Sequence, residues 1–172
     1  ALAPGAAPAA RAAEATVLFQ EKRVSVAVPG DWRRQEAPAA AGQIPAVAYL
    51  SPRGASFNAV LAYTPVRGDF TSLGSFGTIK DVEKFILPDN VNGRMISAKA
   101  TRSNKAYVFD YVVEAPGAPV RHLKTLFALV PQNKATDIPS IISLTAQVLE
   151  SDFNSGVEAT MDGILDSFSF TD

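Results

Sequence analysis

The chain has 172 residues, the size of one domain with a substantial core; 47% of them are hydrophobic and 19% are charged. Sixteen basic residues nearly balance seventeen acidic ones, so the net charge of −1 gives no general attraction to nucleic acid or anionic lipid. The absence of cysteine excludes disulfides, thiolate metal sites and cysteine nucleophiles. No apolar run approaches the roughly 18 to 20 residues that span a bilayer, so the sequence predicts a soluble protein.

The N-terminal end differs in composition from the rest of the chain. Residues 1–15 are mostly alanine, with prolines at positions 4 and 8. Such a segment has too little large apolar surface to fold alone, and proline interrupts helices. We therefore expect residues 1–15 to be a flexible tail and residues 16–172 to form the domain. The small residues at this end also fit a terminus left after a targeting peptide is cleaved.

Strands and tight turns dominate the first half of the chain. The predicted strands here are Thr16–Gln20, Arg23–Pro29, Pro45–Ser51 and Ser56–Pro65. The first two flank a short polar turn and the last two flank a Pro-Arg-Gly turn, so each pair is typical of a hairpin. Between the pairs, we expect Trp32 to pack at the core or its edge and Gln35–Gln43 to form an alanine-rich loop.

A short helix and four more strands follow. Thr78 and Asp81 have the spacing of a capping box, an apolar stripe begins at Val82, and Pro88 ends the helix. The next predicted strands are Arg94–Ser103, Lys105–Ala115, Val120–Pro131 and Ser140–Glu150. A last helix over 151–167 has apolar residues three and four apart and precedes a short terminal strand. Because most links have hairpin length, we expect an α+β sandwich in which helices cover a mainly antiparallel sheet.

Motifs for catalysis are missing from the sequence. There is no phosphate-binding loop, dinucleotide fingerprint, calcium loop or hydrolase G-x-S-x-G context. His122 is the only histidine, so it is the one candidate for an imidazole base, and it cannot form a multi-histidine zinc site. Scattered carboxylates cannot be paired from sequence alone, so a carboxylate-based hydrolytic or ligand-binding protein stays an alternative.

Two neighbouring strands carry the polar residues of most interest. Asp110 lies in the apolar strand Lys105–Ala115, and a buried carboxylate there would need a partner such as Arg121 or Lys124 across the hairpin. Alternation places His122 beside Lys124 on the more polar face of the next strand. We expect His122 to be half-exposed there, with contact to a partner protein, metal binding and catalysis as its alternative roles.

Basic residues supply the predicted partner-binding surface. Arg33 and Arg34 directly follow Trp32 and form a basic pair that suits an acidic partner. Together with Arg121, His122 and Lys124 they are the candidate docking residues. The sequence predicts no catalytic residue and leaves any metal ligand unknown.

With this order of elements, the sequence resembles the PsbP family of thylakoid-lumen proteins. The segments that carry the likeness are VSVAVPGDW (Val24–Trp32), TSLGSFGTIKDVEKFI (Thr71–Ile86), KAYVFDYVVEAPGAPVRHLKTLFALVP (Lys105–Pro131) and the end of the chain from Ser140 to Phe170. Together they extend the likeness over Thr16 to Phe170. His122 takes the place of the histidine with which the corresponding family strand opens.

The resemblance implies an α–β–α sandwich and a nuclear-encoded chloroplast protein, delivered to the thylakoid lumen by a cleaved transit peptide. Members are non-enzymatic. Some are extrinsic subunits that support calcium and chloride retention at the oxygen-evolving centre of photosystem II, and others assist assembly or repair of photosystem II or photosystem I. The resemblance thus implies photosystem subunits at the lumenal membrane face as partners, peripheral thylakoid association, and calcium as the one cofactor to consider.

Departures from the family pattern favour the PsbP-like and PsbP-domain branches over the oxygen-evolving subunit itself. The arginine-tryptophan pair near the start of the last helix is missing, with Asp152-Phe153 in this stretch, and the link from Ile86 to Arg94 is shorter. A related sandwich that serves outside plastids, as in a nuclear-transport protein that binds a small GTPase, is a further alternative.

Overall fold

In a computed structural model of the protein, the structure describes residues 12–19, 22–37, 45–66, 70–101, 105–132, 134 and 138–171. The small sheet contains, in order, β1 (Ala12–Phe19), β2 (Lys22–Pro29) and β10 (Ser169–Thr171). The large sheet contains, in order, β3 (Arg33–Ala37), β4 (Ala46–Ser51), β5 (Gly54–Pro65), β9 (Ser140–Leu149), β8 (Arg121–Leu129), β7 (Ala106–Val113) and β6 (Gly93–Thr101). The described pairings of both sheets are antiparallel, which confirms the predicted α+β fold.

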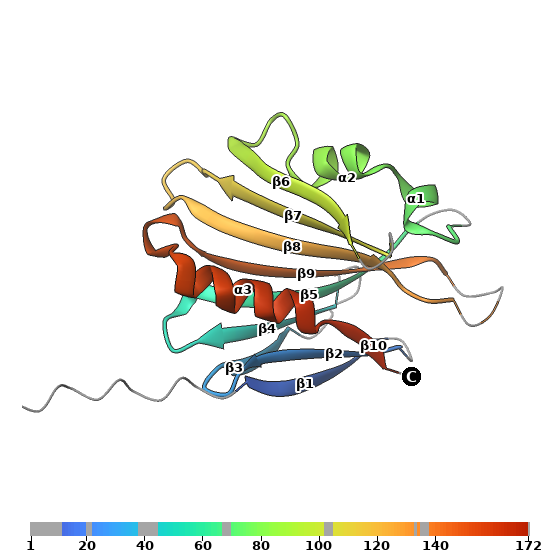
Figure 1. The fold of residues 1–172 in the computed structure, drawn as a ribbon, viewed down its shortest axis with the longest axis horizontal. Helices are drawn as coiled ribbons and strands as arrows, with labels where there is room; N and C mark the ends of the chain where they lie inside the picture. Colours follow the sequence, from blue (N-terminus) through green and yellow to red (C-terminus); the bar gives the residue numbers. More distant parts are fainter. Residues whose placement is uncertain are drawn as a thin grey trace, which may run out of the picture.

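Helices lie on both faces of the large sheet (Figure 1). The helices are α1 (Leu73–Phe76), α2 (Ile79–Ile86) and α3 (Ser155–Ser167), with a 3₁₀ turn over Glu150–Asp152. Consecutive residues of β9 point to opposite faces, since strand side chains alternate. Ile142 belongs to the same core cluster as Met161 of α3, whereas its neighbour Ile141 belongs to a second cluster that contains Val82 of α2. The sheet therefore separates two apolar cores.

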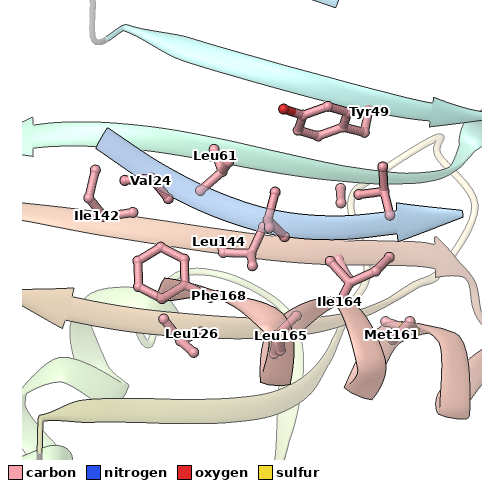
Figure 2. Close-up of a cluster of buried hydrophobic side chains, with 14 of the residues drawn as sticks. Val24, Tyr49, Leu61, Leu126, Ile142, Leu144, Met161, Ile164, Leu165 and Phe168 are labelled. Carbon is pink, nitrogen blue, oxygen red and sulfur yellow. The ribbon is translucent and has the colours of Figure 1, made fainter. Parts of the chain in front are cut away.

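The larger core lies between the central strands, α3 and the small sheet. Figure 2 shows Leu144 and Leu126 of the large sheet facing Leu165 and Phe168, at the end of α3. Val24 of β2 joins the same core and is fully buried. Alternation in β2, which the sequence shows as Val24, Val26 and Val28, thus supplies one wall of this core.

Several predicted elements are confirmed. The hairpins β1–β2, β4–β5 and β7–β8 form as expected, and Gly54 and Gly117 adopt φ values of 65° and 72° in the last two turns, where a side chain would be strained. α2 begins after Thr78, whose hydroxyl accepts from the Asp81 amide at 3.2 Å. The hydrogen bonds from Thr78 to the Asp81 carboxylate hold the pKa of that group below its usual value.

The structure corrects four expectations. β1 begins at Ala12 rather than Thr16, and residues 1–11 of the predicted tail lie outside the described residues. Residues 35–37 belong to β3 rather than to a loop, because their backbone pairs with β4; the rest of that predicted loop also lies outside the described residues. The short helix α1 was not predicted. α3 starts at Ser155 rather than 151, because the Asn154 side chain caps it by accepting from the Val157 amide at 3.0 Å.

One buried hydroxyl offers a direct test of the core. Tyr49 is 2% exposed, burial raises its pKa, and its hydroxyl has no hydrogen-bond partner among the described residues (Figure 2). An unsatisfied buried hydroxyl costs stability, so Tyr49→Phe is expected to raise the free energy of unfolding by about 1 kcal/mol in urea titrations. Tyr63 is the matched control, since its hydroxyl accepts from Ser140 at 2.7 Å and Tyr63→Phe should destabilise. Equal effects of the two changes would contradict this interpretation.

Candidate functional site

The hairpin β7–β8 brings the candidate polar residues onto one face of the large sheet. The register places Asp110 directly opposite Lys124, as predicted for a buried carboxylate with a cross-strand partner. His122 lies two residues before Lys124 and therefore shares its face. The predicted exposure of His122 is wrong: His122 is 3% exposed and Lys124 is 6% exposed.

His122 sits between two carboxylates. Its Nε2 lies 2.6 Å from Oδ1 of Asp110, and its Nδ1 lies 2.7 Å from Oε2 of Glu150. Both ring nitrogens are therefore within hydrogen-bond distance of a carboxylate oxygen, and a ring nitrogen that carries a proton donates to its carboxylate. The two carboxylates thus hold the imidazole ring from both of its nitrogen edges.

An aromatic ring covers the ring of His122. The ring of Phe153 stacks on His122 with centroids 3.7 Å apart and planes only 8° from parallel. Phe153 lies just after the 3₁₀ turn that carries Glu150, so one short segment supplies both the cover and one hydrogen bond. The stack explains why a polar side chain near the start of a strand is buried.

Lys124 joins the sheet to α3. Its Nζ donates to Oδ1 of Asp162 at 2.7 Å and to Oε1 of Glu158 at 3.0 Å, and it lies 3.5 Å from Oδ2 of Asp110. Burial alone would lower the pKa of Lys124, but the hydrogen bonds to Asp162 and Glu158 and the charge of Asp110 outweigh it. The pKa of Lys124 therefore lies above its ordinary value. Glu158 and Asp162 are four residues apart, so they project from the same side of the helix.

We call these residues the charge cluster: Asp110, His122, Lys124, Glu150, Phe153, Glu158 and Asp162. Four carboxylates surround one lysine and one histidine. The polar atoms of His122 and Lys124 bond to partners within the cluster. This arrangement suits a structural role, in which the cluster connects β7, β8 and α3. A general base would instead need a free nitrogen within reach of a substrate.

A hollow of about 400 Å³ opens beside the cluster. Its lining includes Asp110 and Lys124 from the sheet, Lys99 on β6, and acidic residues of α3. It borders the lysine end of the cluster, and His122 is not among the residues that line it. Among the described residues, no three histidine, aspartate or glutamate side chains are arranged to hold a metal ion, so no calcium site is assigned.

The remaining candidate docking residues lie elsewhere. Arg33 and Arg34 are exposed on β3, at one edge of the large sheet. Three strands separate β3 from β8, so the arginine pair is about 19 Å from the charge cluster at the usual strand spacing. Arg34 pairs with Glu36 and donates to the Thr16 carbonyl at 3.0 Å.

Arg121 is half-buried at the start of β8, where its guanidinium donates to the Ala55 carbonyl at 3.2 Å. Of the five predicted docking residues, the structure thus brings only His122 and Lys124 into the charge cluster. Arg33 and Arg34 are the exposed ones.

Sequence reasoning missed four members of the cluster: Glu150, Phe153, Glu158 and Asp162. A signal for two of them was present, because Glu158 and Asp162 alternate with Met161 and Leu165 along one flank of α3. Acidic residues beside an apolar stripe lie at the edge of the buried face, within reach of a basic side chain of the sheet. Phe153 was assigned to the apolar face of the last helix, whereas it precedes that helix and covers His122.

No helix among the described residues is both long enough and apolar enough to cross a bilayer. Three solved structures share the fold. The solution structure of cyanobacterial PsbP (CyanoP) from Synechocystis sp. PCC 6803 has a TM-score of 0.66 at 17% identity and covers 98% of both chains. The crystal structure of LpqN, involved in cell envelope biogenesis of Mycobacterium tuberculosis, has a TM-score of 0.56 at 16% identity and covers 94% of this chain and 92% of that chain. A point mutant of the protein Mog1 has a TM-score of 0.51 at 10% identity, with 91% of this chain and 95% of that chain covered.

No curated protein sequence matches the chain. A family model does match, and it is the model of the PsbP family, over residues 18–170. The match contains every member of the charge cluster and runs from β1 to β10. It spans nearly all of the sequence, and it agrees with the antiparallel sandwich shared with cyanobacterial PsbP. This chain belongs to the PsbP family.

Proposed function

We propose that the protein is a non-catalytic, PsbP-family protein of the chloroplast thylakoid lumen that binds a photosystem, as an extrinsic subunit or as an assembly or repair factor. The observation that carries the proposal is the match to the PsbP family over residues 18–170. The closed charge cluster supports a non-catalytic role, because its histidine is covered and both ring nitrogens have partners.

The structure favours a PsbP-like or PsbP-domain protein over the oxygen-evolving subunit. Asp152-Phe153 stands where that subunit is expected to carry arginine and tryptophan, and Phe153 here has an internal partner in His122. Exposed Arg33 and Arg34 supply the docking surface for an acidic partner, while Lys124 contributes by holding α3 against the sheet. His122 contributes by joining β7 to the segment that carries Glu150 and Phe153.

Affinity purification from solubilised thylakoids tests this function. The tagged protein is expected to capture photosystem subunits and to co-migrate with a photosystem or its assembly intermediates in native gels. Arg33→Glu should reduce the capture several-fold, since it reverses the charge of an exposed docking residue. Lys99→Glu, an exposed lysine of β6 at the opposite edge of the sheet, is the matched control and should leave the capture intact.

A protein that stays free in the lumen at all developmental stages would overturn the proposal, provided that deletion also leaves photosystem levels normal. Equal loss of capture in the two variants would retain the photosystem role and reject the arginine surface. The second candidate is ligand binding or hydrolysis by carboxylates, favoured by the hollow of about 400 Å³ that reaches Asp110. Turnover that is abolished by Asp110→Asn would establish that candidate instead.

A further inference from the structure

A second hollow lies on the face of the large sheet that α3 does not cover. It lies between the central strands and the helices α1 and α2 and has a volume of about 280 Å³, a size near the lower end for small-molecule sites. We call it the α2 groove; its lining residues with apolar side chains are Val66, Phe76, Phe85, Ile86, Phe127 and Ile141. Its lining residues with hydroxyl groups are Thr64, Tyr111, Thr125, Ser143 and Thr145.

We propose that the α2 groove binds a small, uncharged molecule that has an apolar body and a carbonyl oxygen. The site is independent of the arginine surface and of the charge cluster, which lie at the sheet edge and on the other face of the sheet. Three features of the groove specify this ligand: an aromatic rim, a floor of hydroxyl groups with a spare hydrogen-bond donor, and a lining without charge.

The rim of the α2 groove exposes aromatic side chains to water, which is unfavourable when no ligand covers them. Phe85 is 69% exposed on α2, whereas Val82 of the same helix is buried. Phe76 and Phe127 lie on the inner side of the groove with ring centroids 5.6 Å apart. Contact with an apolar ligand would remove part of the Phe85 ring from water, which favours binding.

The floor holds a row of three hydroxyl groups from three adjacent strands. The Tyr111 hydroxyl lies 3.0 Å from Oγ1 of Thr125, and that atom lies 2.9 Å from Oγ1 of Thr145. Three hydroxyls carry three donor hydrogens, whereas these two contacts use only two. Among the described residues one O–H donor therefore remains for a ligand, and a carbonyl oxygen is an acceptor that would use it.

The charge state of the ligand follows from the lining. None of the described residues around the α2 groove is charged. Burial raises the pKa of Tyr111, so its hydroxyl stays a neutral donor at physiological pH. An ion placed here would lose its hydration without gaining an opposite charge, which is unfavourable. An uncharged ligand is thus preferred over an anion or a cation of the same size.

Matched naphthalene probes test the proposal on the whole chain. Dissociation constants would be measured by ¹H–¹⁵N NMR titration with 2-acetylnaphthalene, 2-ethylnaphthalene and 2-naphthoate. The ketone is expected to shift the amides of Thr125 and Thr145 and to bind about two- to tenfold tighter than the ethyl analogue, the gain of one hydrogen bond. The naphthoate should bind at least tenfold more weakly than the ketone.

Variants of the groove separate this site from general adsorption. Ser143→Leu fills the groove and should abolish ketone binding, with the NMR spectrum reporting whether the fold is intact. Phe85→Ala alters only an exposed side chain and should weaken binding at least threefold, whereas Ile138→Ala, a 68% exposed residue outside the groove, should leave it unchanged. Absence of binding, equal affinity for the ketone and the ethyl analogue, or equal effects of the Phe85 and Ile138 variants would each overturn the proposal.

Discussion

Lys124→Met is expected to lower the free energy of unfolding by about 3 kcal/mol, measured by urea titration with Trp32 fluorescence. Removing one partner of a buried ion pair leaves the other charges uncompensated, and measured costs of about 3 to 5 kcal/mol are typical. We expect a loss at the low end of this range because the side chains of Glu158 and Asp162 are 43% and 49% exposed, so water can hydrate them once Lys124 is removed. Asp110 does not, since its side chain is only 15% exposed.

The difference in free energy of unfolding between wild type and Lys124→Met should depend on pH, which gives a second, independent check. The pKa of Lys124 is raised in the folded state. The stabilisation that its charge provides is therefore complete at any pH below the pKa of an unfolded lysine, about 10.4. That contribution is lost as the pH rises through the higher folded pKa. The difference between wild type and Lys124→Met should therefore be constant near neutral pH and shrink above about pH 10.5.

The matched control for Lys124 is Lys84→Met, which removes an exposed lysine from α2, away from the hollow beside the charge cluster. It should change the free energy of unfolding by less than about 0.5 kcal/mol, as is usual for surface substitutions. A loss as large as that of Lys124→Met would show that general charge, rather than the buried cluster, stabilises the fold.

His122→Ala is expected to destabilise the protein by roughly 3 kcal/mol in the same titrations. The change removes both hydrogen bonds to Asp110 and Glu150 and leaves a cavity under Phe153. His122→Phe separates the two causes, because a second aromatic ring keeps the stack and loses only the two hydrogen bonds. Its cost should be clearly smaller than that of alanine. Equal costs would show that the stack on Phe153 contributes nothing.

The local part of the charge cluster could be predicted from the sequence, whereas its distant part could not. The alternating strands and the Pro-Gly turn place Asp110 opposite Lys124, because a hairpin fixes the register of neighbours along the chain. The pairing of β9 with β8, and the position of α3 above them, depend on the order of strands in the sheet. Those two facts bring Glu150 and Asp162 to the cluster, and neither follows from local pattern.

Burial of His122 illustrates the same limit. Its strand face contains lysine and histidine, so alternation indicated a half-exposed side chain. Phe153 reverses that conclusion by covering the ring from a distant segment. β3 was missed for a related reason: the segment Arg33–Ala37 is polar, with no apolar alternation, and is a strand only because its backbone pairs with β4. Propensity and pattern do not report such pairing.

The predicted docking surface changes as a consequence. Two of the five predicted docking residues hold the inside of the domain together, so variants at His122 or Lys124 would reduce binding through loss of structure. Interaction experiments on this chain therefore need stability measurements beside them, whereas Arg33 can be altered without such a confound because it is exposed.

The pairing of β10 with β2 has a consequence for how the domain is made. Residues 169–171 complete the small sheet that begins at Ala12, so segments near the two ends of the sequence are hydrogen-bonded neighbours. A chain that emerges from its N-terminus forward, from a ribosome or through a membrane pore, cannot close this sheet until the last strand is out. Until then the edge of β2 stays unpaired on that side, and because long-range strand pairing slows folding, we expect the small sheet to close late.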